Sequence, residues 1–209
     1  MNNAAATAGA CLDAALAIIL EKESELARLD SVAGDGDHGA GMARGFRAAA
    51  AADRSGTPGQ VLAQAGAAFS NAAGGASGAL VGMFIMTVGS SLTSPTPDAR
   101  AVYNALTAGV GALARLGKAQ LGDKTMLDTL IPFVEAYGAA VEAGAGVSAA
   151  WQQALPAAAA GRDSTKDMVS KRGRSAVLKE KSLGHLDPGA ASMYYVLEAV
   201  GSVLAEQCP

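Results

Sequence analysis

Residues Gly74 to Leu92 read GGASGALVGMFIMTVGSSL and are the most informative segment for the fold. Its second part, from Ala79 to Leu92, is apolar at almost every position. A helix without a polar face is buried on all sides, so this segment predicts a central helix surrounded by other helices. The small residues from Gly74 to Gly78 predict a break before that helix.

The composition on both sides of this segment favours helices over strands. Nearly a quarter of the residues are alanine, which has the highest helix propensity and the least bulk, whereas aromatic residues make up only 4%. A β-sandwich or barrel would be richer in Val, Ile, Thr and aromatic residues. We expect about eight helices in one domain that spans residues 1–209. Hydrophobic spacing and helix breakers place the other helices near residues 7–29, 38–52, 60–73, 99–116, 125–143, 148–160 and 189–206.

The charge balance excludes several function classes. Sixteen basic and 19 acidic residues give a net charge of −3, and without a basic stripe there is no electrostatic footprint for nucleic acid. We find no apolar run as long as a membrane span, and the N-terminus lacks the positive region of a signal peptide. Cys11 and Cys208 form no disulfide framework. We therefore expect a cytoplasmic protein that binds neither nucleic acid nor membranes.

The polar residues gather in four short, glycine-rich connectors between apolar helices. A glycine inside a helix costs about 1 kcal/mol relative to alanine, so four such connectors predict a shared site at the helix ends. They lie within residues 30–39, 74–78, 117–126 and 165–189. The two histidines of the chain, His38 and His185, both fall in these connectors.

The first connector carries three carboxylates, Asp30, Asp35 and Asp37, with glycines between them. Close carboxylates raise one another's pKa unless a cation relieves the repulsion, and ligation by oxygen alone suits Mg²⁺ or Ca²⁺ rather than Zn²⁺. Helix capping would explain one aspartate, but three favour a metal site. The glycine spacing of this connector also matches a dinucleotide-binding fingerprint. That interpretation is excluded because the fingerprint must follow a strand, and no strand precedes this connector. An EF-hand is excluded because Phe46 stands where the loop requires a bidentate glutamate.

The other three connectors have the chemistry of a phosphate site, and each also has a plainer interpretation. Residues 74–78 present backbone N–H groups at a helix N-terminus, which suits an anion or a simple turn. Lys118 and Lys124 could face a phosphate or solvent, and Met126 could pack in the core or against a flat adenine ring. In the basic fourth connector, Arg174 offers phosphate a bidentate fork, and a solvated loop is the alternative.

Together these segments resemble the nucleotide-binding L subunit of dihydroxyacetone kinases, the Dak2 domain. The matching stretches are GDGDHGAGMARGF, GGASGALVG, GKAQLGDKTMLD and KRGRSAVLKEKSLGHLDPGA, in the order of the family and across essentially the whole chain. The resemblance implies an all-α barrel of about eight antiparallel amphipathic helices, with the nucleotide site in the loops at one end. It also implies two Mg²⁺ ions, held by Asp30, Asp35 and Asp37, that bridge the phosphates of ADP or ATP.

The same resemblance implies roles for residues in all four connectors. Phosphate contacts are implied for His38, Gly39, Ala40, Gly41, Ser77 and Gly78. Positions near the base are Gly117 and Met126, and the remaining nucleotide contacts are Arg174, Asp187, Pro188 and Gly189. As catalytic residues we predict the three aspartates and Arg174, because an arginine could stabilise charge on the transferred phosphoryl group.

The resemblance implies one component of a two-component kinase, because this chain has no obvious pocket for a ketose, which the family holds on a separate K subunit. The phosphoryl donor stays open between exchanging ATP and a phosphotransferase-system phosphoprotein that rephosphorylates bound ADP. The acceptor is dihydroxyacetone or another short ketose. A non-catalytic nucleotide-sensing subunit and a Ca²⁺-stabilised helical domain are the alternatives. The sequence does not decide between a monomer and a homodimer.

Overall fold

The computed structural model describes residues 4–173, 176 and 179–207, and in this part of the chain it contains helices and no strand. The α-helices are α1 (Ala4–Ser31), α2 (His38–Ala50), α3 (Pro58–Ala73), α4 (Gly75–Ser91), α5 (Ala99–Gly117), α6 (Leu127–Glu142), α7 (Val147–Ser164) and α8 (Pro188–Gln207). The described residues between α7 and α8 include the short 3₁₀-helices η1 (Thr165–Asp167) and η3 (Lys179–Ser182). The predicted all-α class is confirmed.

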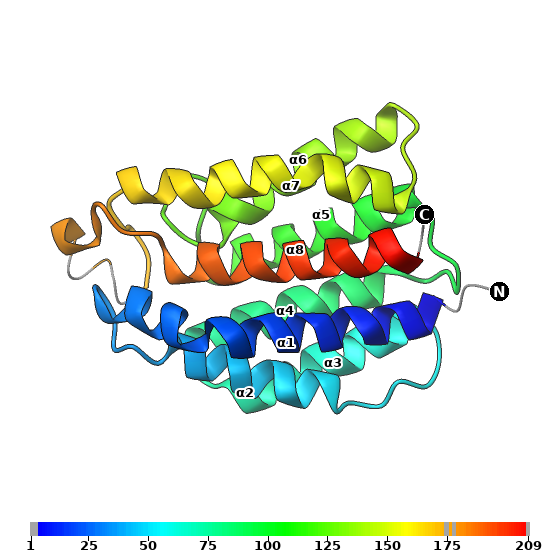
Figure 1. Cartoon of the computed structure of the whole chain (residues 1–209), viewed down its shortest axis with the longest axis horizontal. Coiled ribbons are helices and arrows are strands. Elements are labelled where there is room, and N and C mark those ends of the chain that lie inside the picture. The colour runs from blue at the N-terminus through cyan, green and yellow to red at the C-terminus, as the bar shows by residue number, and fades with distance from the viewer. Residues whose placement is uncertain (1–3, 174–175, 177–178, 208–209) are drawn as a thin grey trace.

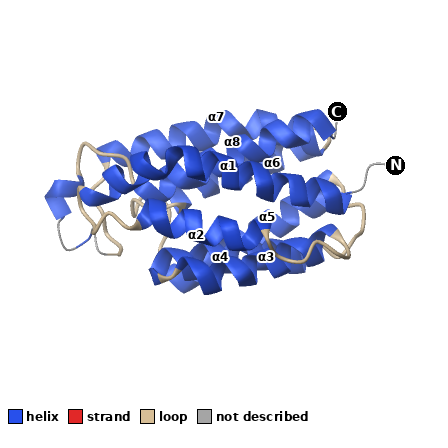
Figure 2. Cartoon of the chain, turned by 60° about the horizontal axis from the view of Figure 1, so that its bottom comes forward, coloured by secondary structure: helices blue, strands red, loops and turns tan. Residues whose placement is uncertain are grey.

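The α-helices form a closed ring. Each helix packs against the next one along the chain, and α8 returns to pack against α1. Successive helices run in opposite directions along the long axis of the molecule, as the two views in Figure 1 and Figure 2 show. The apolar face of each amphipathic helix is thereby buried against its neighbours. The helical fold that the resemblance implies is therefore present, and the details of a barrel stay a prediction.

Close packing of small and aromatic residues fills the interior of the ring. Phe46 on α2 and Phe69 on α3 are almost completely buried, and their rings meet edge-on with centroids 5.0 Å apart. Glycines bring backbones still closer: a Cβ on Gly66 of α3 would lie 2.8 Å from the carbonyl oxygen of Gly82 on α4. A larger residue at this position would push the two helices apart, which explains the small residues in these helices.

The expectation that the apolar segment is a central helix, buried on all sides, is wrong. α4 is a member of the ring and packs mainly between α3 and α5. Val81 and Phe84 are buried, but Met83 and Met86 are only half-buried. The physical reason is the closed ring itself, because every helix in a single ring keeps one side on the outside of the molecule.

By length and composition alone, α1 could cross a membrane. This finding differs from the expectation that no apolar segment of the sequence is as long as a membrane span. It lies near the N-terminus, and 33% of its apolar window is buried inside the structure. The helix packs against α2 and α8, and its Asp13 forms an ion pair with Arg54. Core helices of soluble proteins and signal sequences can have the same length and apolar composition, so these two properties are weak evidence for a membrane span.

The antiparallel order brings alternate connections to the same end of the molecule. The connections α1–α2, α3–α4, α5–α6 and α7–α8 lie opposite the end that carries both termini, on the left in Figure 1. These are the four glycine-rich connectors of the sequence. The ring therefore provides the shared end that the predicted site requires.

Candidate functional site

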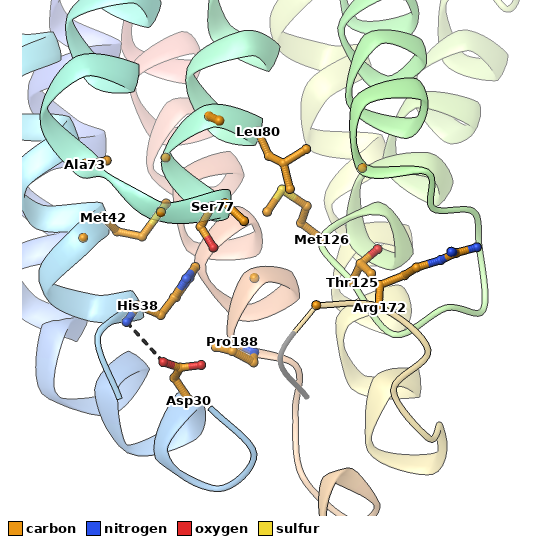
Figure 3. A pocket seen from close by; sticks show the side chains of 18 of the residues that line it. Asp30, His38, Met42, Ala73, Ser77, Leu80, Thr125, Met126, Arg172 and Pro188 are labelled. Carbon is orange, nitrogen blue, oxygen red and sulfur yellow. Dashed lines mark hydrogen bonds between the residues drawn. The ribbon is translucent and has the colours of Figure 1, made fainter. Parts of the chain in front are cut away.

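A pocket of about 520 Å³ opens among these four connections, and every one of them contributes to its walls. Figure 3 shows side chains converging on it from several helices. The predicted site residues that line it are Asp30, Asp35, Asp37, His38, Gly41, Ser77, Gly78, Gly117, Met126, Asp187, Pro188 and Gly189. Gly39 and Ala40, in the first turn of α2, are not part of the lining. Arg174 lies outside the described residues.

The three aspartates of the α1–α2 connection meet on one side of the pocket. Asp30 is next to the last residue of α1, and Asp37 directly precedes α2. A tight turn follows Asp30, in which the N–H of Gly34 donates to the carbonyl oxygen of Asp30 at 2.6 Å. One carboxylate oxygen from each of Asp30, Asp35 and Asp37 lies within 4.8 Å of the other two.

This set of donors fits a hard divalent cation. All three ligands are carboxylates, which Mg²⁺ and Ca²⁺ prefer. Asp30 is half-buried, whereas Asp35 and Asp37 are exposed, so water and phosphate oxygens have access to the remaining coordination positions. A Cβ on Gly34 would collide with the side chain of Asp30. The glycine in this connector is therefore required for the turn that brings the carboxylates together.

His38 joins the start of α2 to α8. Its ring is buried, with Nε2 lying 3.0 Å from the hydroxyl oxygen of Ser192. Burial lowers the pKa of the ring and favours its neutral form. The backbone N–H of His38 donates to Oδ2 of Asp30 at 3.3 Å, the dashed line in Figure 3. His38 thus contacts the carboxylate cluster through its backbone and the scaffold through its ring.

The α3–α4 connection is a single residue, Gly74, which has a φ of +72°. The predicted break from Gly74 to Gly78 is therefore too long, because Ser77 and Gly78 already belong to the first turn of α4. This turn lines the pocket, and Figure 3 places Ser77 between His38 and Met126. Helix N-termini carry partial positive charge and favour anions, so the turn suits a phosphate group.

Lys124, in the α5–α6 connection, is enclosed by the α7–α8 connection. Lys124 is only 4% exposed. The ammonium group donates to the carbonyl oxygens of Met168 at 3.1 Å, His185 at 2.7 Å and Ser182. Its three hydrogens therefore have three backbone acceptors. Neither a phosphate nor solvent, the two alternatives considered from the sequence, is its main partner.

The rest of the α5–α6 connection is held by Asp128, which is completely buried. Its carboxylate accepts from the backbone N–H of Gly122 at 2.6 Å and of Thr125 at 2.7 Å. Met126 is part of the hydrophobic core and also lines the pocket. The core interpretation is confirmed, and contact with an adenine ring stays a prediction. Lys118 is exposed and is not among the lining residues.

The α7–α8 connection completes the pocket. Asp187 caps α8, since its Oδ2 accepts from the N–H of Ala190 at 2.7 Å. It keeps partial exposure, but the surrounding protein limits its contact with water, and this burial raises its pKa to about 7. Nε of Arg172 donates to Asp123 at 2.9 Å. In Figure 3 Arg172 consequently points away from Asp30 and His38.

Three residues in or beside the pocket were missed by sequence reasoning: Arg44, Asp128 and the internal role of Lys124. Asp128 follows Thr125 by three residues at the start of an apolar helix, a spacing typical of N-terminal capping that could have revealed it. Arg44 lies three residues after Gly41 and therefore shares its helix face, which was a usable signal. Nothing local to Lys124 distinguishes it from a surface lysine, because its partners are more than forty residues away.

The same fold occurs in a solved kinase. The native crystal structure of the dihydroxyacetone kinase of C. freundii matches this chain with a TM-score of 0.72 and 27% identity over 94% of the chain, which corresponds to 34% of that kinase. The structure of that kinase in complex with AMP-PNP and Mg²⁺ matches with a TM-score of 0.67.

A family model described as the DAK2 domain matches residues 32–202. This chain belongs to the DAK2 domain family. One DAK2 relative, the L-erythrulose kinase of Pectobacterium atrosepticum, is 42% identical over 96% of this chain and 35% of its own length. Another, the ADP-binding subunit DhaL of the PEP-dependent dihydroxyacetone kinase of Escherichia coli, is 34% identical over 90% of this chain and 92% of the subunit. The chain thus spans about a third of the erythrulose kinase but nearly all of the subunit.

Proposed function

We propose that this chain is the nucleotide- and Mg²⁺-binding component of a cytoplasmic ketose kinase. It would transfer a phosphoryl group from a nucleotide to a hydroxyl of dihydroxyacetone or another short ketose, which a K-type subunit or domain would hold. The observation that carries the proposal is the meeting of three carboxylates at a pocket bounded by all four connections. A carboxylate cluster beside a helix N-terminus suits a metal-bound polyphosphate.

Asp30, Asp35 and Asp37 would hold the Mg²⁺ ions. When bound, Mg²⁺ would neutralise phosphate oxygens and help align the donor with the acceptor. Phosphoryl transfer depends on positioning and charge neutralisation more than on covalent participation by the protein. The proposal therefore needs no nucleophile from this chain. The N–H of His38 on Asp30 would keep one carboxylate oriented.

The remaining lining residues would hold the two ends of the nucleotide. Ser77 and Gly78 at the start of α4 would face the phosphates. Met126 would offer an adaptable apolar surface to the base, and Gly117 would also lie near the base. The further contacts would come from residues at the start of α2 and α8 and from the fourth connector: His38, Gly39, Ala40, Gly41, Asp187, Pro188, Gly189 and Arg174.

The acceptor would come from a partner or from a further part of a longer chain. The E. coli relative is named as the ADP-binding subunit of a dihydroxyacetone kinase, and this chain matches nearly all of that subunit. The erythrulose kinase is far longer than the matched region. Because the identity to the erythrulose kinase is the higher of the two, erythrulose is an acceptor to test alongside dihydroxyacetone.

The metal assignment is tested by titrating ADP with and without Mg²⁺ into the wild type, Asp35→Asn and Asp53→Asn. Asp53 is an exposed aspartate that accepts a hydrogen bond from Ser55 and does not line the pocket, so it is the matched control. Loss of a metal ligand should weaken Mg²⁺-dependent ADP binding by roughly tenfold or more, since even outer-shell changes have effects of this size. Wild-type protein that binds no ADP, or Asp35→Asn with unchanged affinity, would contradict the proposal.

The phosphoryl donor is tested by measuring the nucleotide and metal content of freshly purified protein. Retained ADP and Mg²⁺ would favour the phosphoprotein-driven version. Empty protein that gains thermal stability with Mg-ATP would favour exchange of ATP from solution, because ligand binding to the folded state raises Tm. Transfer with a K-type partner then separates a kinase from a nucleotide-sensing subunit, which would show none.

A further inference from the structure

Arg44 lies in the second turn of α2 and contributes to the pocket wall beside Gly41, Ala73 and Gly74. The residue is exposed. One nitrogen of its guanidinium group, Nη2, donates to the carbonyl oxygen of Ala73 at 3.0 Å. This bond directs the guanidinium group to the end of α3, immediately before Gly74 and the first turn of α4.

The charges of the described lining make Arg44 distinctive. Four aspartates line the pocket, together with three cationic side chains: Arg44, Lys124 and Arg172. Lys124 directs its ammonium group to three backbone carbonyl oxygens. Arg172 is paired with a carboxylate, that of Asp123. Arg44 takes part in none of the ion pairs found among the described residues.

The surroundings of Arg44 leave room for a ligand. A Cβ placed on Gly74 or Gly75 would have no atom within 4 Å, so the space beside the α3–α4 connection is open. A guanidinium group has five N–H donors in a planar fork, and the bond to Ala73 directs only one nitrogen. The others can form the charge-assisted pair that arginine makes with phosphate oxygens.

The plainer interpretation is that Arg44 only caps the C-terminus of α3, where cations are favourable. It accounts for the bond to Ala73. It does not account for an arginine without a carboxylate partner at the wall of a pocket lined by four aspartates. A polyphosphate brought into that pocket would need protein cations as well as metal ions to offset the repulsion.

We propose that Arg44 is a phosphate-binding residue that contacts the outermost phosphate of the bound nucleoside di- or triphosphate. The inference rests on the proposed function, because it assumes that the pocket binds a nucleotide. It assigns to Arg44 the discrimination between nucleotides with a polyphosphate and those with one phosphate or none. The base and the sugar make no contact with it.

The test compares the affinities of ADP, AMP and adenosine, with saturating Mg²⁺, for the wild type and three variants. Arg44→Met removes the positive charge. Arg44→Lys keeps the charge but lacks the planar set of N–H donors of a guanidinium group. Arg47→Met is the matched control, because Arg47 lies on the same helix three residues further on and does not line the pocket. The Tm of each variant is measured alongside.

In Arg44→Met, ADP affinity should fall roughly 10- to 100-fold, the range expected for a lost hydrogen bond to a charged group. The affinities of this variant for AMP and adenosine should stay within a factor of about two of the wild-type values. The ADP affinity of Arg44→Lys should lie between those of the wild type and Arg44→Met. Arg47→Met should bind all three like the wild type. If Arg44→Met does not fold, a loss confined to ADP in Arg44→Lys supports the same assignment.

Two results would overturn the inference and leave the proposed function standing. Unchanged ADP affinity in Arg44→Met and Arg44→Lys would mean that Arg44 only caps α3. An equal loss for ADP, AMP and adenosine would mean that Arg44 acts through the shape of the pocket. Wild-type protein that binds none of the three ligands would instead overturn the proposed function, and the inference with it.

Discussion

The ring of His38 and the hydroxyl group of Ser192 lie 3.0 Å apart, although 154 residues separate them in the chain. Ser192 also donates to the carbonyl oxygen of Gly189, in the first turn of α8. The pair therefore ties the start of α2, which follows the carboxylate cluster, to the start of α8, which forms another wall of the pocket. Two walls that are distant in sequence are held in a fixed relation by one buried polar contact.

Replacing Ser192 by alanine should destabilise the protein. The buried imidazole nitrogen of His38 would lose its partner, and an unsatisfied buried polar group costs about 1–3 kcal/mol. The measurement is the Tm by calorimetry or circular dichroism. Ser202→Ala is the control, because that hydroxyl donates to the carbonyl oxygen of Glu198 on the exposed side of the same helix. Equal Tm values for the two variants would show that the contact contributes nothing to stability.

Replacing Lys124 by methionine should loosen the α7–α8 connection. The three carbonyl oxygens of Met168, Ser182 and His185 would lose a shared donor, with an expected cost of at least about 2 kcal/mol. Limited proteolysis should then cut the region of residues 168–185 faster than in the wild type. Lys118→Met is the matched control, since both lysines have positive φ but Lys118 is exposed. Identical cutting rates in the two variants would contradict a tethering role for Lys124.

Asp187 should make the stability of the nucleotide-free protein depend on pH. Its pKa is about 7 in the folded state against an ordinary 3.8, so between these values the folded protein holds a proton that the unfolded chain releases. Stability must then fall as the pH rises from about 4 to about 7. Nearby charges modulate this pKa: Lys124 lowers it, and Asp128 raises it.

Asp187→Asn removes that titration and keeps an oxygen that can cap α8. At pH 5 the variant and the wild type should have similar Tm values. At pH 8 the variant should be more stable by about 1 kcal/mol or more, which corresponds to roughly 2–4 °C for a protein of this size. Asp167→Asn, at an exposed position in η1, is the control. A Tm difference that stays constant between pH 5 and pH 8 would rule out this role of Asp187.

Gly39 and Gly41 should respond differently to alanine. A Cβ on Gly39 would collide with the carbonyl oxygen of Glu23 on α1, so the start of α2 would have to move at a cost of about 1–3 kcal/mol. A Cβ on Gly41 would meet the carbonyl oxygen of Ala73 at 3.5 Å, an ordinary contact. Gly41→Ala should therefore leave Tm unchanged or raise it slightly. The result that would refute this account is a larger loss of Tm in Gly41→Ala than in Gly39→Ala.

The predictions made from local patterns agree well with the structure. The helix that starts at His38 begins where it was expected, and the one that starts at Ala99 does so too. The close approach of Asp30, Asp35 and Asp37 was also predictable, because glycine spacing allows a tight turn and all three lie within eight residues. The least accurate prediction concerned residues 74–92, where an apolar composition was interpreted as complete burial.

Local sequence patterns are sufficient to predict the helical class, the four glycine-rich connectors and the carboxylate cluster. These properties depend on helix propensity, apolar spacing and chain reversals, which act within a few neighbouring residues. In contrast, the inward direction of Lys124, the contact of His38 with Ser192 and the position of Arg44 at the end of α3 depend on the packed helices. Each of these partners belongs to another part of the ring, so the contact exists only when the helices have packed around a common interior.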